Sequence, residues 1–201
     1  MLEAADLDCE RGGRTLFRGL SFTVRGGELL HVKGPNGSGK TSLLRILCGL
    51  LAPSRGEVRW RGRPIRELRE DYAREVAYIG HASAIKDDLT ATENLAIACK
   101  LAGIAASEAA LRSALGRFAI EEDVPVRRFS QGQRRRAALA RLVLSASVPL
   151  WFLDEPFSAL DEDATRLTEE LVRQHVARGA AVVFTTHQET SIAAARVVEL
   201  G

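Results

Sequence analysis

The segment from Gly34 to Thr41 constrains the fold of this chain more than any other. It reads Gly-Pro-Asn-Gly-Ser-Gly-Lys-Thr, which completes the pattern G-x-x-x-x-G-K-[ST], and it lies between an apolar stretch and a helical pattern. In this order, glycines let successive backbone N–H groups curl around a polyphosphate, and the helix that follows presents its positive end to the same anion. The segment therefore predicts a phosphate-binding loop between a strand and a helix.

The same pattern predicts which side chains serve this loop. Lys40 is expected to reach the β- and γ-phosphates of a nucleotide, and the Thr41 hydroxyl is expected to bind Mg²⁺. A chance match is the alternative, and the flanking strand and helix make it the weaker one. The predicted phosphate-binding residues are Gly34, Pro35, Asn36, Gly37, Ser38, Gly39, Lys40 and Thr41.

The remaining chain alternates between strand and helix patterns. Apolar residues at helical spacing dominate 88–147, which predicts a helical subdomain of about three helices, and 133–147 is expected to be helical throughout. An amphipathic helix is expected at 165–177. Strands are expected at 20–24, 29–32, within 52–62, and at 75–79, 148–153, 181–185 and 196–200. This alternation predicts a single α/β domain over 1–201 with a largely parallel sheet.

Composition narrows the class of protein. The chain has 201 residues, 46% hydrophobic and 27% charged, and its net charge of +2 gives no general attraction to nucleic acid. Cys9, Cys48 and Cys99 lack metal-site spacing, and with no signal-peptide pattern at the start they fit a reducing compartment. No apolar run reaches the roughly 18 residues of a membrane span. The basic runs at 61–69 and 134–136 are interpreted as solvated surfaces.

A hydrophobic strand pattern ends in two carboxylates, Asp154 and Glu155. In phosphate-loop enzymes a carboxylate at this place holds Mg²⁺, directly or through water, so Asp154 is a predicted metal ligand. Glu155 is then free to orient or deprotonate an attacking water. The alternative is an acidic strand end in solvent, which the phosphate loop makes less favoured.

The segment from Ser130 to Gln133 admits two interpretations. Its S-x-x-Q spacing is that of a capping box, in which case it is a helix start and nothing more. The functional alternative is an anion site made of the Ser130 hydroxyl, the Gly132 N–H and the helix dipole. Its place shortly before the two carboxylates favours the functional interpretation.

Five motifs together resemble the ATP-binding subunits of ABC transporters. They come in that family's order over nearly the whole chain: Gly34–Thr41, Phe129–Gln133, Val148–Glu155, Ser158–Asp161 and Thr185–His187. The resemblance implies a P-loop NTPase fold with a mainly parallel sheet core, an antiparallel β subdomain and a helical subdomain at about 88–147. It also implies an ATPase that uses ATP and Mg²⁺ and works as an ATP-dependent, head-to-tail homodimer.

The resemblance also implies roles for individual residues. Glu155 becomes the catalytic base, Asp154 belongs to the metal site, and His187 is the switch residue that contacts the γ-phosphate. Ser42 lies beside the phosphates, and Asp161 links the two sites across the dimer. The residues implied to contact the ATP of the partner copy are Ser130, Gln131, Gly132 and Gln133.

Two positions depart from the family pattern. Where the family has a glutamine that contacts Mg²⁺ and water and couples to the membrane subunit, this chain has His81, a candidate metal and water ligand whose coupling role stays open. Where the family stacks adenine on an aromatic residue, this chain has Arg11, whose planar guanidinium can stack on the base, with Phe17 as the alternative. His31 and His175 match no family motif and are interpreted as structural.

Shorter stretches, at 15–17, 80–91, 134–142 and 186–188, are similar to the ATP-binding subunits of bacterial cytochrome c maturation. That similarity implies a peripheral protein on the cytoplasmic face of the inner membrane. Its partners would be a transmembrane permease subunit and other cytochrome c maturation subunits, without direct contact to nucleic acid. Hydrolysis would serve haem export and release of a haem-loaded chaperone. The alternatives are an ATPase subunit of another small-substrate ABC transporter, a nucleic-acid-acting ABC protein and a module that hydrolyses nothing.

Overall fold

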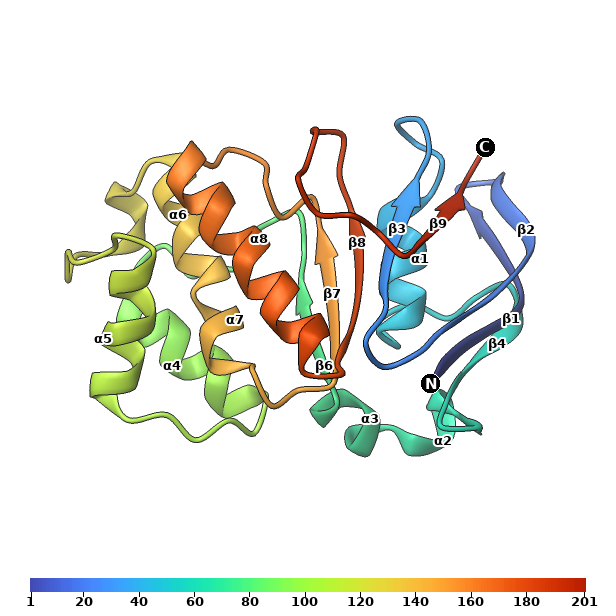
Figure 1. Cartoon of the computed structure of the whole chain (residues 1–201), viewed down its shortest axis with the longest axis horizontal. Coiled ribbons are helices and arrows are strands. Elements are labelled where there is room, and N and C mark those ends of the chain that lie inside the picture. Colours follow the sequence, from blue (N-terminus) through green and yellow to red (C-terminus); the bar gives the residue numbers. More distant parts are fainter.

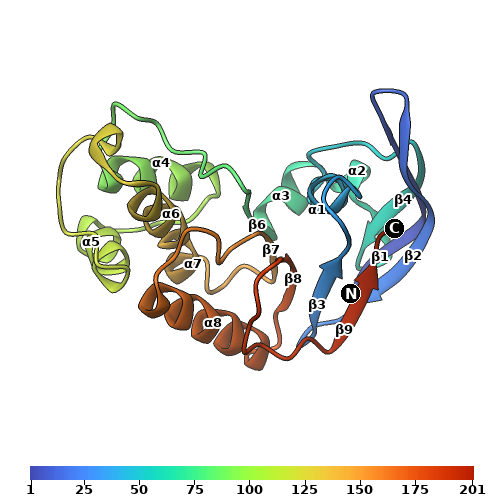
Figure 2. The ribbon, with the colours of Figure 1, turned by 90° about the horizontal axis from the view of Figure 1, so that it is seen from above.

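The computed structural model describes all residues from 1 to 201, and it contains two sheets. One sheet has five strands in the order β6-β7-β8-β3-β9, and the other has four in the order β2-β1-β4-β5. Figure 1 shows the five-stranded sheet between the antiparallel strands and a group of helices, and Figure 2 shows the same arrangement from above. The predicted α/β class with a mainly parallel core and an antiparallel part is confirmed.

The five-stranded sheet is parallel throughout, so the carboxyl ends of its strands meet at one edge. Every residue of β7 and β8 is buried, which explains their unbroken apolar sequences. The observed bounds lie within two residues of the predicted ones. The strands are β3 (Leu29–Lys33), β6 (Val76–Ile79), β7 (Leu150–Asp154), β8 (Ala181–Thr185) and β9 (Arg196–Glu199).

A hydrophobic core covers each face of this sheet. On β7, Trp151 and Leu153 belong to a cluster of 27 buried residues that includes α8 (Glu162–Ala177) and the helical group. Leu150 and Phe152, the alternate residues, belong to a cluster of 23 that includes α1 (Lys40–Leu47) and the antiparallel strands. Because successive side chains of a strand point to opposite faces, the two clusters lie on opposite faces of the sheet.

The helical group confirms the helical character expected for 88–147, but the expected number of about three helices was wrong. It contains α4 (Ala91–Leu101), α5 (Glu108–Arg117), α6 (Gln131–Leu139), α7 (Arg141–Leu144) and the 3₁₀ turn η1 (Val126–Arg128). The stretch 133–147, predicted as one helix, breaks at Ala140. There Val143 N donates to Ala140 O, an i→i+3 bond that tightens the chain.

The antiparallel sheet contains a long strand that the sequence patterns did not predict. This is β1 (Leu2–Arg11), which pairs with β2 (Arg14–Val24) and β4 (Arg55–Trp60), and β5 (Arg63–Pro64) pairs with β4. Register shifts between Ala4 and Leu7 and a positive φ of 51° at Asp6 mark a bulge. The bulge breaks the period-2 alternation by which strands are recognised.

Three further helices complete the fold. The short α2 (Ile65–Leu68) and α3 (Glu70–Arg74) precede β6, and α8 begins three residues before the predicted start at 165. The earlier start follows from a cap, because Asp161 Oδ1 accepts a hydrogen bond from Ala164 N at 2.8 Å. None of the helices has the length together with the apolar character that a transmembrane span requires.

Candidate nucleotide-binding and catalytic site

Four loops that carry predicted site residues leave the same edge of the parallel sheet. The phosphate loop follows β3, Glu155 follows β7, His187 follows β8 after one residue, and His81 follows β6 after one residue. Ligands of open parallel sheets bind outside the carboxyl ends of the strands. The fold therefore gathers these distant parts of the sequence where a ligand is expected.

The phosphate loop depends on glycines at two positions in particular. Gly34 has a φ of 150°, and a Cβ there would lie 2.4 Å from Leu200 O, so a side chain would collide with the end of the chain. Gly37 has a φ of 82°, which L-residues rarely adopt, and a Cβ there would meet nothing within 4 Å. The loop thus packs tightly against the fold at Gly34 and faces open space at Gly37.

The N-terminus of α1 differs from that of every longer helix. The helices α4, α5, α6 and α8 each have a side-chain cap, supplied by Thr90, Ser107, Ser130 and Asp161. By contrast, α1 is preceded by Gly39, which has no side chain to cap it, and its first turn holds no acidic residue. The free N–H groups and positive dipole end of α1 are therefore left for an external anion.

Lys40 and Ser38 supply polar groups within the loop. Lys40 is 8% exposed, and its Nζ donates to Gly34 O at 2.7 Å and to Pro35 O at 3.0 Å. Ser38 Oγ is buried and has no hydrogen-bond partner. A buried ammonium beside an unpartnered hydroxyl fits a phosphate group, which accepts charge-assisted hydrogen bonds.

Asp154 connects the phosphate loop to two strands. It is 1% exposed; Asp154 Oδ2 accepts from Thr41 Oγ1 at 2.8 Å, and Oδ1 accepts from Thr185 Oγ1 at 2.9 Å. Mg²⁺ prefers oxygen ligands and is usually held by one or two carboxylates together with substrate phosphates. The juxtaposed Thr41 hydroxyl and Asp154 carboxylate fit that ion. Thr185 was not among the predicted residues, because a threonine ending a strand has no distinctive pattern.

Glu155 and His187 face each other beside this pair. The Glu155 side chain is 15% exposed, and its Oε2 accepts from His187 N at 3.2 Å. Glu155 Oε1 is buried without a hydrogen-bond partner and lies 3.6 Å from His187 Nε2. A carboxylate oxygen that lacks a donor is available to accept a proton from water. The arrangement is therefore suited to general-base chemistry.

The structure does not bring every predicted residue into this cluster. His81 is exposed, and no hydrogen bond or ion pair joins it to Thr41 or Asp154, so its metal role stays a prediction. Arg11 is exposed at the end of β1. Phe17 is the alternative residue for stacking on adenine. A Cβ added at Gly39 would lie 3.2 Å from the Phe17 ring, so Phe17 packs on the phosphate loop. Burial raises the pKa of the Cys9 thiol, and the nearby Ser42 hydroxyl acts weakly in the opposite direction.

The segment 130–133 forms the capping box at the start of α6. Gln133 N donates to Ser130 Oγ at 3.2 Å, and Ser130 N donates to Gln133 Oε1 at 2.8 Å. Asp161 caps α8 and lies 3.6 Å from Arg136. Figures 1 and 2 both place α6 and α1 on opposite sides of β7 and β8. Within one chain, this segment therefore does not complete the phosphate site.

One expectation about charge is corrected. The run at 134–136 was interpreted as a solvated surface, but Arg135 is 3% exposed. Helical spacing was the signal that could have found it, because Arg135, Leu139 and Leu142 are four and three residues apart and all are buried. The arginines of 61–69, in contrast, are exposed as predicted.

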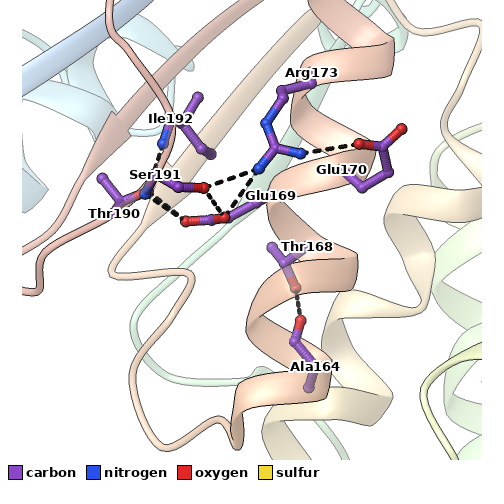
Figure 3. A network of polar contacts seen from close by, with 8 residues as sticks. All are labelled: Ala164, Thr168, Glu169, Glu170, Arg173, Thr190, Ser191 and Ile192. Atoms are coloured by element: carbon purple, nitrogen blue, oxygen red, sulfur yellow. Dashed lines mark hydrogen bonds and ion pairs between the residues drawn. The ribbon is translucent and has the colours of Figure 1, made fainter.

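A polar network on α8 anchors the segment that follows His187 (Figure 3). Glu169 is 5% exposed and accepts from Thr190 Oγ1 and Ser191 N at 2.8 Å each and also from Ser191 Oγ, while Arg173 Nη2 donates at 3.0 Å. Burial raises the pKa of Glu169, but hydrogen bonds from Ser191 and Thr190 and the Arg173 charge outweigh it and lower that pKa overall. Sequence reasoning missed this anchor.

Known proteins resemble this chain in sequence over most of its length. The family model described as ABC transporter matches residues 17–158. A protein of Nitrosospira multiformis named "Cytochrome c biogenesis ATP-binding export protein CcmA" is 49% identical over 99% of this chain and 97% of its own length. A protein of the same name from Nitrosomonas europaea is 52% identical over 94% of this chain and 89% of its own length.

Solved structures show the same architecture. A structure described as the ATP-binding subunit of an ABC transporter has a TM-score of 0.83 and 29% identity, and the match covers 93% of this chain and 79% of that one. A dimeric ATP-binding cassette bound to ADP and Pi has a TM-score of 0.81 over 94% of this chain and 88% of its own. At 23% identity the second likeness shows the fold alone.

Proposed function

This chain belongs to the ABC transporter family, and on that premise we propose that it is the ATP-hydrolysing subunit of a membrane complex for cytochrome c maturation. The chain is an ABC-type ATPase. One observation carries the hydrolytic part of the proposal: the unpartnered Glu155 Oε1 lies 3.6 Å from His187 Nε2, at the sheet edge where the phosphate loop also begins.

The proposed reaction assigns each group at this edge one task. Lys40 and the N–H groups of the loop bind the phosphates of ATP, and the α1 dipole favours their charge. Thr41 and Asp154 would hold Mg²⁺, which neutralises charge on the phosphates when it is bound. Glu155 Oε1 orients the attacking water and takes its proton. His187 contacts the γ-phosphate and is held toward Glu155 by its own backbone N–H.

A second copy of the chain would complete each ATP site. The segment 130–133 lies on the opposite side of β7 and β8 from α1, so its proposed contact with ATP requires the phosphate loop of another protomer. The proposal is an ATP-dependent head-to-tail homodimer in which Ser130, Gly132 and Gln133 contact the partner's nucleotide. Asp161, at the start of α8, would link the two sites.

The names of the relatives support the pathway. Two proteins named for cytochrome c biogenesis and ATP-binding export match this chain over nearly its whole length. We therefore place the subunit on the cytoplasmic face of the inner membrane, bound through a transmembrane permease and other cytochrome c maturation subunits. Hydrolysis would drive haem export or release of a haem-loaded chaperone.

The Glu155→Gln variant tests the hydrolytic assignment. The amide keeps the shape of the side chain but cannot accept a proton near neutral pH. We therefore expect kcat to fall by about 100-fold or more, the usual contribution of a general base. ATP affinity, measured by equilibrium binding, should stay within a few-fold because the phosphate contacts remain. Glu189→Gln, which changes an exposed carboxylate near His187, is the matched control. Turnover at the wild-type rate in Glu155→Gln would remove Glu155 as the base.

The same variant tests the pathway, because it should hold the complex in its ATP-bound form. It would be purified from its own membranes in mild detergent with ATP and Mg²⁺, its partners identified by mass spectrometry and haem sought in the visible spectrum. Cytochrome c maturation subunits are the expected partners. An unrelated permease would leave the ATPase assignment in place and reject the proposed role in cytochrome c maturation. Ribosomes or DNA would reject both that role and the proposed binding to a transmembrane permease.

A further inference from the structure

Arg135 connects three places in the fold that the proposed reaction must keep aligned. Its Nη1 donates to Gly80 O at 2.7 Å, and its Nη2 donates to Asp154 O at 2.9 Å and to Glu155 O at 2.7 Å. Gly80 directly follows β6, Asp154 ends β7, and Glu155 directly follows it. One side chain of α6 therefore fixes the carboxyl ends of two neighbouring strands.

The Glu155 backbone is in need of such support. Its φ is 51°, a left-handed conformation that costs a non-glycine residue free energy and persists only where the surroundings hold it. Arg135 binds the carbonyl of Glu155, while Thr185 Oγ1 accepts from the Glu155 N–H at 3.0 Å. The peptide groups on both sides of the Glu155 Cα are thus restrained, and that restraint sets where the carboxylate points.

Arg135 is also an unusual choice for a purely structural contact. It is 3% exposed, forms no salt bridge, and its Nε is buried without a partner. Burying a guanidinium is costly unless its hydrogen bonds are well matched, and an apolar residue often stabilises a fold equally well. The planar fork of arginine, however, can bind carbonyls from two loops at once, which an apolar residue cannot do.

We propose that Arg135 is a positioning residue for ATP hydrolysis, which holds Glu155 in its catalytic conformation and ties it to the loop before His81. The proposal rests on the assignment of Glu155 as the base. It also gives α6 a double task, since the capping box at Ser130 begins the same helix that carries Arg135. A movement of α6 at the dimer interface would then be transmitted to Glu155 of the same chain.

The test compares Arg135→Met and Arg135→Lys with wild type in steady-state ATPase assays, with equilibrium ATP binding measured on the same samples. Displacement of a reacting group by about 1 Å typically costs on the order of 100-fold in rate, so kcat per ATP-binding site should fall by ~10- to 100-fold in Arg135→Met. The Kd for ATP should stay within about twofold. Arg135→Lys keeps the buried positive charge but lacks the planar guanidinium, so its kcat per ATP-binding site should fall by about tenfold.

Arg141→Met is the matched control, because Arg141 is a neighbouring arginine that donates no side-chain hydrogen bond and forms no salt bridge. A merely structural role for Arg135 would lower the fraction of protein that binds ATP and leave kcat per site unchanged, and that result would overturn the proposal. If Arg135→Met does not fold, a wild-type kcat in Arg135→Lys would overturn it equally. A wild-type rate in Glu155→Gln would instead reject the assignment of Glu155 as the base. The failure of that assignment can therefore be told apart from the failure of the role proposed for Arg135.

Discussion

At the scale of single residues, Thr185 shows how a strand end can align two carboxylates. Its Oγ1 donates to Asp154 Oδ1 at 2.9 Å and accepts from Glu155 N at 3.0 Å. Because Thr185 ends β8, the end of β7 is fixed by its neighbour in the sheet. Asp154 and Glu155 can therefore take separate tasks although they are adjacent in sequence, one toward Thr41 and the other toward His187.

His81 provides a prediction at this scale. The residue is exposed and makes no hydrogen bond or ion pair with Thr41 or Asp154, so we expect His81→Gln to keep kcat within about twofold of wild type. Steady-state ATPase rates between pH 6 and pH 8 are the measurement. A collapse of activity in the glutamine variant would show that the imidazole itself is required.

Much of the candidate site could be predicted at this scale, and the exceptions have a common reason. Lys40, Thr41 and Asp154 lie in short patterns whose chemistry is visible without a fold. Thr185 and Arg135 act through contacts with residues 31 and 19 positions away, which no local pattern records. For Arg135 the misleading signal was charge: an arginine among arginines suggested solvent, while its helical spacing indicated burial.

At the scale of elements, α8 holds the segment after His187 through one buried carboxylate. Glu169 receives hydrogen bonds from Thr190 and Ser191 and an ion pair from Arg173. The helix thereby fixes the far end of a loop whose near end is strand β8 (Figure 3). His187 lies between these two attachments, and its position against Glu155 depends on both.

We therefore expect Glu169→Gln to loosen this loop. Loss of hydrogen bonds to a charged group should lower the free energy of unfolding by about 2 kcal/mol, and kcat should fall several-fold while the Kd for ATP changes little. Urea unfolding and limited proteolysis of the segment 187–192 measure the effect. Glu170→Gln is the control, since Glu170 pairs with the same Arg173 but is 48% exposed and does not touch the loop. Equal behaviour of the two variants would contradict the role of Glu169.

Which elements could be predicted also has a physical reason. The strands β3, β6, β7 and β8 are short apolar runs in a sheet buried on both faces, so composition alone marks them. The strand β1 was missed because a bulge at Asp6 disturbs its alternation, and the break at Ala140 was missed because alanine favours helix on either side. Tertiary packing determines both the bulge in β1 and the break at Ala140, and such packing leaves no pattern in the local sequence.

At the scale of the whole molecule, the junction between α8 and β7 makes stability depend on pH. His175 is fully buried, stacks on Trp151 with ring centroids 3.6 Å apart, and has no hydrogen bond to either nitrogen. Burial, together with the nearby Arg178 charge, lowers its pKa from 6.5 to about 4. His31, which stacks on Phe184 at 4.4 Å, is likewise packed in the interior.

The sign of the effect follows from that pKa. The folded state disfavours the protonated imidazole of His175. The contribution of neutral His175 to the free energy of unfolding is therefore complete above pH 6.5, and it is lost as the pH falls from 6.5 toward 4. Relative to His175→Phe, which keeps the stacking but cannot titrate, wild type should lose about 3 kcal/mol of unfolding free energy between pH 7 and pH 4. Urea unfolding at several pH values measures this difference, with His81→Gln as an exposed-histidine control. Parallel curves for wild type and the phenylalanine variant would contradict it.

The uncapped start of α1 has a consequence for the lifetime of the protein in the cell. A helix that carries no side-chain cap of its own gains hydrogen bonds from the anion it binds, so the nucleotide stabilises the folded chain. When ATP becomes scarce, we expect the turn at Gly39 and Lys40 to open more readily than it does with nucleotide bound, and opened segments are what proteases cleave. Energy supply would then set not only how fast this subunit works but also how long it survives.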